Sequence, residues 1–208
     1  IVRLRVVHSS GAVALSSPAS MQKLTLNPGI QTVGVSVVRA PVFAGTISSI
    51  NGSTLLLNDD ASLTAAIDAD ARYYLEVRAG KYAGQRFDVH TVADSPLTLD
   101  LTASHNTLAA SPSDLVGASI VVRPHLTLSS AFDPDRLQAG LTPTAADQVL
   151  FFESGGYVTY WLFNGGRDES LRGWLRVGDG ADTSRANPIL APGTGVMVKV
   201  LSGSRTWA

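Results

Sequence analysis

Short runs of apolar residues, many of them alternating with polar residues, recur along this chain between turn-forming residues. The clearest example is residues 42–57, where two β-forming runs flank Asn51 and Gly52. Asn-Gly favours a type I′ turn, because both central residues of that turn need a positive φ. We therefore expect an antiparallel hairpin, with residues 46–50 leading into the turn and residues 55–57 leading out of it.

Similar runs predict strands along most of the chain. They lie at residues 1–7, 22–26, 32–38, 73–77, 86–92, 97–101, 119–122, 148–152, 157–163, 174–177 and 196–200. The connections are too short for the crossovers that parallel strands need, so antiparallel pairing is expected. Capping residues predict two short helices, one starting at Asp60 and one running from Asp133-Pro134 to Gly140. The expected fold class is all-β, with small antiparallel barrel or sandwich modules and one or two short helices.

A boundary between two β modules is expected near residue 140. Residues 141–146, which include Thr142-Pro143-Thr144, have the composition of a linker. We predict that residues 1–140 form a β-barrel or β-sandwich module and that residues 141–208 form a second one, incomplete or packed on the first. The chain begins at Ile1 and ends in a strand-like segment, so we expect it to be a processed form or fragment of a longer protein.

Charge and composition narrow the expected partners. Charged residues make up 16% of the chain, against roughly 25% in typical soluble domains, and the net charge is −1. No basic field would attract nucleic acid or anionic lipid, and no apolar run is long enough to cross a bilayer as a helix. Serine, threonine and valine are abundant where other soluble proteins have charged residues. That composition is common in extracellular β proteins, so we expect a secreted or cell-surface protein.

The chemistry-bearing residues form no catalytic motif, so we expect that the protein is not an enzyme. The absence of cysteine excludes thiolate nucleophiles, disulfides and zinc–thiolate sites. The four histidines lack metal-binding spacing, and no G-x-S-x-G motif is present. These histidines are His8, His90, His105 and His125. A Ser-His-Asp triad assembled only in space stays open, because triads are defined by geometry and not by order.

Two small acidic clusters offer candidate ligands for calcium, which binds six to eight oxygens that often come from loops. The first is the loop at residues 178–183, with the carboxylates of Asp179 and Asp182. The second is Asn58-Asp59-Asp60. The alternative is that both are solvated turn residues and helix caps. No other cofactor is expected.

An aromatic cluster in the last third of the chain offers candidate ligand-binding residues. Tyr157, Tyr160 and Trp174 lie close together in sequence, beside Trp161 and Phe163. Aromatic rings are large flat apolar anchors, so the face of a strand that does not enter the core can present them to a sugar. The alternative is that Trp161 and Trp174 form the core and that Tyr160 is a cross-strand partner.

The first seven residues, IVRLRVV, form an apolar strand that can pair with an open sheet edge of a neighbouring copy. Such donor-strand contacts are head-to-tail and build filaments when the rotation does not close. The alternative is that the strand pairs within its own chain. The apolar residues of this candidate assembly strand are Ile1, Val2, Leu4, Val6 and Val7.

Five segments of the chain carry a family resemblance. They are residues 35–57 (VSVVRAPVFAGTISSINGSTLLL), 73–89 (YYLEVRAGKYAGQRFDV), 119–128 (SIVVRPHLTL), 173–180 (GWLRVGDG) and 192–200 (PGTGVMVKV). Together, and in this order, they resemble an uncharacterised family of secreted bacterial β-rich proteins associated with PEP-CTERM-type sorting. The resemblance implies a β-rich fold and export from the cell. It implies no activity, cofactor or site residue.

Two classes of function fit these patterns. The first is a non-enzymatic extracellular structural or assembly protein: a surface, matrix or filament subunit that polymerises by strand donation. Its expected partners are copies of itself or other cell-surface components. The alternative is a carbohydrate-binding or adhesion module of a secreted protein, with a polysaccharide as its partner. A hydrolase would need the spatial triad described above.

Overall fold

A computed structural model describes the chain at residues 24–35, 38–58, 63, 65–68, 71–90, 97–100, 112–153, 155–180 and 185–207. These ranges are mostly antiparallel β-sheet with very little helix, which confirms the expected all-β fold class. The strands are β1 (Leu24–Leu26), β2 (Gly29–Gly34), β3 (Phe43–Asn51), β4 (Thr54–Leu57), β5 (Tyr73–Val77), β6 (Arg86–His90), β7 (Leu97–Asp100), β8 (Ser119–Pro124), β9 (Gln148–Glu153), β10 (Gly156–Phe163), β11 (Gly173–Arg176), β12 (Gly195–Val200) and β13 (Arg205–Trp207). The helical elements are η1 (Pro112–Leu115), α2 (Leu128–Ala131), η2 (Pro134–Arg136), η3 (Pro143–Ala145) and η4 (Glu169–Leu171). Within the described ranges, no helix has the length and apolar character needed to cross a membrane.

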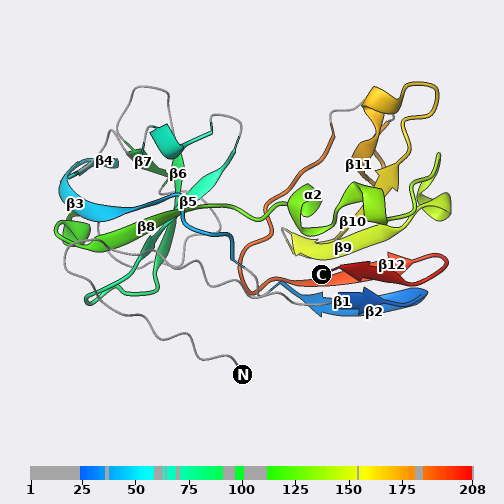
Figure 1. The fold of residues 1–208 in the computed structure, drawn as a ribbon, viewed down its shortest axis with the longest axis horizontal. Helices are drawn as coiled ribbons and strands as arrows, with labels where there is room; N and C mark the ends of the chain where they lie inside the picture. The colour runs from blue at the N-terminus through cyan, green and yellow to red at the C-terminus, as the bar shows by residue number, and fades with distance from the viewer. Residues whose placement is uncertain are drawn as a thin grey trace, which may run out of the picture.

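Six strands close into a barrel in the order β3-β4-β7-β6-β5-β8 (Figure 1). The predicted hairpin forms its β3–β4 corner, where Asn51 pairs with Thr54 and Gly52 has a φ of 62°. Alternate side chains of the strands enter the barrel, so the short alternating runs of the sequence supply its core. The buried core residues are Phe43, Ile47, Leu55, Leu57, Leu63, Tyr73, Leu75, Val77, Phe87, Val89, Leu115, Ile120 and Val122.

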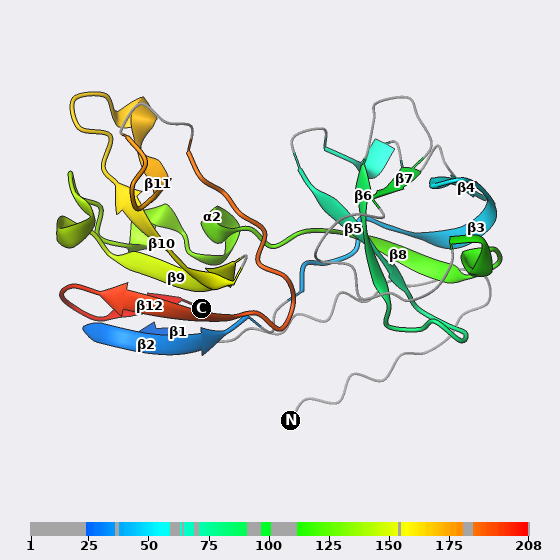
Figure 2. The same ribbon diagram turned by 180° about the vertical axis from the view of Figure 1, so that it is seen from behind.

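A five-stranded antiparallel sheet forms the other lobe, in the order β11-β10-β9-β12-β2. β12 lies between β9 and β2, so residues from the two ends of the chain are hydrogen-bonded side by side. β1 pairs with β13 in a separate two-stranded sheet, where Leu24 lies opposite Trp207. Figures 1 and 2 show the barrel and the sheet as two neighbouring lobes.

The sheets do not divide the chain at the predicted position between residues 140 and 141. β1 and β2 precede the barrel in sequence but pair with β13 and β12, which follow it. The barrel strands, residues 43–124, are therefore inserted between β2 and the rest of the five-stranded sheet. Alternation along residues 29–34 shows that this segment is half-buried, but only long-range packing selects its partner.

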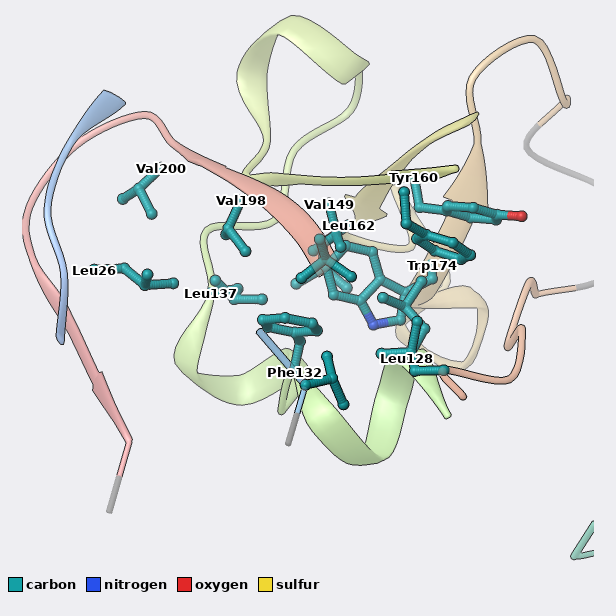
Figure 3. Close-up of a cluster of buried hydrophobic side chains, with 14 residues drawn as sticks. Leu26, Leu128, Phe132, Leu137, Val149, Tyr160, Leu162, Trp174, Val198 and Val200 are labelled. Carbon is teal, nitrogen blue, oxygen red and sulfur yellow. The ribbon is translucent and has the colours of Figure 1, made fainter. Parts of the chain in front are cut away.

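The core of the five-stranded sheet lies on one of its two faces, which we call the inner face (Figure 3). Leu128 of α2, together with Phe132 and Leu137, covers this face, although all three precede the predicted boundary. α2 is held at its start by a capping box between Thr127 and Ser130. The buried residues of this core are Leu26, Val35, Leu128, Phe132, Leu137, Val149, Phe151, Tyr160, Leu162, Trp174, Leu190, Val196, Val198 and Val200.

The predicted helix after Asp133 is present only as the 3₁₀ turn η2. The Asp133 carboxylate accepts a hydrogen bond from the Asp135 N–H, so the predicted cap is confirmed. The turn stops after Arg136 because Leu137 is extended and buried in the core of the sheet. The predicted linker contains a second 3₁₀ turn, η3. Asp60, the other predicted cap, lies outside the described residues.

Candidate functional site

Two of the three predicted ligand-binding aromatics lie in the core of the five-stranded sheet. Trp174 is 1% exposed and Tyr160 is 5% exposed. Figure 3 shows both rings within the buried cluster, with the Tyr160 hydroxyl at its margin. Trp174 and Tyr160 are therefore core residues, and neither ring is available to a ligand. Tyr157, the third residue, is 64% exposed.

Tyr160 has a defined electrostatic environment. Its ring stacks on Phe151 with 5.1 Å between centroids, and its hydroxyl donates to the Glu153 carboxylate at 3.2 Å. Burial, together with the nearby negative charge of Glu153, raises the pKa of Tyr160 to about 12. The phenol is therefore a structural hydrogen-bond donor at neutral pH.

Tyr157 forms an exposed aromatic pair with Phe152, its cross-strand neighbour on β9. The ring centroids are 5.6 Å apart and the rings are nearly perpendicular, at 82°. Phe152 is 61% exposed, so the pair stands on the face opposite the core. Phe152 was not among the residues predicted from the sequence. The signal that could have found it is its position directly after Phe151, because neighbouring residues of a strand point to opposite faces.

The aromatic pair belongs to a larger surface on the sheet, which we call the outer face. It consists of two rows of side chains across four strands. In the first row Thr159, Leu150, Met197 and Thr32 lie side by side. In the second row Tyr157 pairs with Phe152 and Gly195 pairs with Gly34. Phe152 and Gly195 are the next residues after the paired Phe151 and Val196, so the two pairs lie in one row. No residue of either row is charged.

The outer face ends at a small second core. Trp161, Phe163, Leu175 and Ala146 are buried together beside η3. Trp161 stands in the third row of the sheet, with Gln148, Lys199 and Ile30. This second core closes the outer face at Trp161, whereas Ile30, at the other end of the third row, is 64% exposed.

The edge of the sheet at β2 is the second exposed feature. Among the described residues, β2 pairs with β12 and with no other strand. Its sequence, GIQTVG, contains neither a charged residue nor a proline, and Ile30 is 64% exposed. β11, the opposite edge, is shorter and carries Arg176.

The predicted calcium ligands are not brought into a metal site by the part of the chain that the structure describes. Asp179 is exposed in the loop after β11, and Asp182 lies outside the described residues. Asn58 is exposed at the end of β4, while Asp59 and Asp60 lie outside the described residues. Within the described ranges, no group of three or more His, Asp or Glu side chains could hold a metal ion.

The predicted assembly strand, with Ile1, Val2, Leu4, Val6 and Val7, also lies outside the described residues. So do His8 and His105.

His125 is buried, and its Nε2 is 2.9 Å from the Asp88 carboxylate. The neighbouring Arg123 contacts Glu76 at 3.2 Å and donates to the Arg39 carbonyl at 2.7 Å. The Arg123–Arg39 hydrogen bond ties the barrel to the segment that follows β2.

A pocket of about 470 Å³ lies at one end of the barrel, between the β5–β6 turn and the segment from η1 to β8. Its floor includes Val77 and Ala118. Tyr82 donates from its hydroxyl to Asp114 at 2.8 Å, and the Lys81 ammonium lies 4.9 Å from the centre of the Tyr82 ring. Hydrogen bonding to Tyr82 raises the pKa of Lys81. The polar groups of the pocket therefore satisfy one another.

Comparisons of the chain with protein-family models, with curated proteins and with solved structures found no match.

Proposed function

We propose that this protein is a non-enzymatic structural subunit that works outside the cell and assembles by strand addition at the β2 edge. The observation that carries the proposal is that, in the described part of the chain, β2 is an edge strand without charge or proline. An edge strand offers a row of backbone N–H and C=O groups that another strand can use. Natural proteins guard long edges with charged residues, proline, bulges or a covering element. The six residues of β2 have no charge and no proline.

The occupant that we propose for this edge is the segment of residues 1–7 from another copy. Val2, Leu4 and Val6 alternate with Arg3 and Arg5, so as a strand the segment would have one apolar and one charged face. The apolar face would lie toward the molecule and the charged face toward water. Addition of this segment to β2 is head-to-tail, so it would extend into an open filament. The low content of charged residues and the resemblance to secreted proteins support an extracellular setting.

The proposal is tested by one proline substitution in the donor segment. Leu4→Pro removes a backbone donor and should abolish strand pairing by residues 1–7, whereas Leu4→Val keeps both the donor and the β propensity. We expect filaments from the wild-type chain and from Leu4→Val, and a folded chain that forms no filaments from Leu4→Pro. Light scattering and negative-stain electron microscopy distinguish these states.

The acceptor edge has its own test. Ile30→Lys places a charge on β2 at a site that is already exposed, so the fold should persist while strand addition is lost. Filaments that survive both Leu4→Pro and Ile30→Lys would refute the proposal. General unfolding of the Leu4→Pro chain would show instead that residues 1–7 pair within their own chain.

Polysaccharide binding is the second candidate function, and the exposure of Tyr157 is the observation that favours it. Aromatic side chains at binding surfaces supply large apolar contacts with a polar tip. A glycan array probed with the wild-type chain and with Tyr157→Ala tests this candidate, and Tyr160→Ala serves as the control for a buried ring. Binding that Tyr157→Ala abolishes would support it. No binding to any polysaccharide would remove it.

A further inference from the structure

The outer face of the five-stranded sheet has an order of large and small residues that complements itself. Across the second row, from β10 to β2, the residues are Tyr157, Phe152, Gly195 and Gly34. The two aromatic rings therefore stand beside two positions that have no side chain. A Cβ atom built at either Gly34 or Gly195 would meet no atom within 4 Å, so the space above both glycines is open.

We propose that the outer face packs against the outer face of a second copy and forms a closed two-fold dimer. A two-fold axis that runs parallel to the strands, between β9 and β12, places β10 over the partner's β2 and β9 over the partner's β12. Tyr157 then lies over the partner's Gly34, and Phe152 lies over the partner's Gly195. Each aromatic pair fills the gap above the other copy's glycines.

The first row is consistent with the same axis. Leu150 lies over the partner's Met197, so an apolar side chain meets an apolar one. Thr159 lies over the partner's Thr32, so two hydroxyl groups meet. Sheets that pack face to face lie about 10 Å apart and cross at roughly 30°. The four strands that carry the two rows are the strands nearest the axis, so their side chains stay in contact at that angle.

The charges of the sheet also fit a second copy. Both rows are uncharged, so no charge would be buried between the copies. Lys199 is the one charged residue of the third row. The proposed axis places Lys199 opposite the partner's Gln148 and not opposite another Lys199. The dimer therefore brings no like charges face to face.

A second copy accounts for this surface better than a polysaccharide does. The rings of Tyr157 and Phe152 are 82° apart, so they do not form one flat platform for a sugar chain. Thr159, Thr32 and the Tyr157 hydroxyl are the polar side-chain groups of the two rows, whereas sites for polar ligands hold several converging polar groups. The outer face therefore fits an apolar partner surface better than a sugar chain, if that partner surface also has a ridge beside a gap.

The proposed dimer is distinct from the proposed filament. Strand addition uses the edge of β2 and continues from copy to copy, whereas the outer-face contact is isologous and stops at two copies. Sedimentation velocity separates them, because one produces a limiting dimer and the other produces growing species. Leu4→Pro provides a background in which strand addition is suppressed.

Filling the glycine gap is the sharpest test. Valine at position 34 is a good strand residue and meets open space in its own copy, so Gly34→Val should fold. It should weaken the dimer at least tenfold, because the partner's Tyr157 loses the gap. Gly156→Val is the matched control. Gly156 is also an open strand glycine of this sheet, but it follows the alternation of Val158 and Tyr160 and so belongs to the inner face.

In the Leu4→Pro background, we expect the chain with no further change and the chain with Gly156→Val to sediment as concentration-dependent dimers with similar dissociation constants. A chain that stays monomeric at all concentrations would overturn the proposal. So would a dimer that Gly34→Val leaves unchanged. Binding of a polysaccharide through Tyr157 by a monomeric chain would assign the face to a saccharide, and the proposal would then fail.

Cross-linking provides a second readout that does not depend on the glycine variants. The chain has no cysteine, so thiols introduced by substitution are the only ones present. A Thr32→Cys chain mixed with a Thr159→Cys chain should cross-link with a short bismaleimide, because the two positions lie opposite each other across the dimer. Each variant alone should cross-link several-fold less, because like positions are three strand spacings apart. Equal cross-linking in all three samples would refute the proposed axis.

Discussion

Asp147 joins three stretches of chain that are distant in sequence. Its side chain is fully buried. One carboxylate oxygen accepts hydrogen bonds from the Gln138 N–H at 2.8 Å and from the Arg205 guanidinium at 3.3 Å. The other accepts from the Leu201 N–H at 2.8 Å. A single carboxylate therefore satisfies donors before β9, after β12 and in β13.

Loss of this carboxylate should be costly. Asp147→Ala leaves the part-buried Arg205 guanidinium and two part-buried N–H groups without their acceptor, so we expect the free energy of unfolding to fall by about 3 kcal/mol. Urea denaturation followed by circular dichroism measures the change. Asp133→Ala is the control, because Asp133 is a half-exposed cap and its loss should cost only about 1 kcal/mol. Equal effects of the two variants would contradict this role of Asp147.

Tyr160 should ionise at a higher pH than an ordinary tyrosine. Its pKa is about 12 in the folded chain, against an ordinary value of 10.0, so the folded state holds the phenol proton more tightly than the unfolded state. The resulting contribution to stability is fully present below pH 10 and is lost as the pH rises toward 12. Tyrosinate absorbance during an alkaline titration should show one late step that Tyr160→Phe removes. An unchanged titration curve in that variant would show that Tyr160 has an ordinary pKa.

At the scale of an element, the β3–β4 hairpin depends on Gly52. The φ of 62° at this position is left-handed, which costs a residue with a Cβ roughly 1–2 kcal/mol. We expect Gly52→Ala to lower the free energy of unfolding by about 1 kcal/mol, measured by chemical denaturation. Gly34→Ala, at a strand position with open space and no positive φ, should be neutral or slightly stabilising. A destabilising Gly34→Ala would point to contacts that β2 makes beyond β12.

Most strands could be predicted from the sequence because their signals are local. The run at residues 73–77 is β5, and the Asn51-Gly52 turn joins β3 to β4 as expected. Pairing between β2 and β12 could not be predicted in the same way. Several strands of this chain have similar alternation, and the choice among them depends on which cores they share.

The candidate site was only partly predictable. Of the three aromatics selected from the sequence, Tyr157 is exposed, whereas Tyr160 and Trp174 are buried. Alternation along β10 separates Tyr157 from Tyr160, yet both faces of this strand are apolar near Trp161. Because the second core beside η3 covers part of the outer face, alternation alone could not show which end stays open.

At the scale of the whole molecule, the barrel is an insertion in the other lobe. We expect a chain in which a flexible glycine-serine linker replaces residues 38–124 to keep the five-stranded sheet folded, because β1, β2 and the segments from α2 to β13 are all retained. Residues 141–208 alone should stay unfolded, because they lack β2 and the buried residues Leu128, Phe132 and Leu137. Circular dichroism and amide dispersion in NMR spectra measure both outcomes. A folded 141–208 fragment would restore the boundary predicted from the sequence.

The pairing of β2 with β12 also sets the order in which this protein can be completed as it is made. β2 leaves the ribosome before the barrel strands and its partner β12 leaves after them, whereas the barrel strands between them pair with one another. Barrel folding should therefore precede sheet closure, and refolding should show a slower phase for the sheet, since closing a long loop costs entropy before the contacts form. Until β12 has been made, the uncharged β2 strand remains unpaired, and a cell that makes this chain must prevent it from pairing with another copy too early.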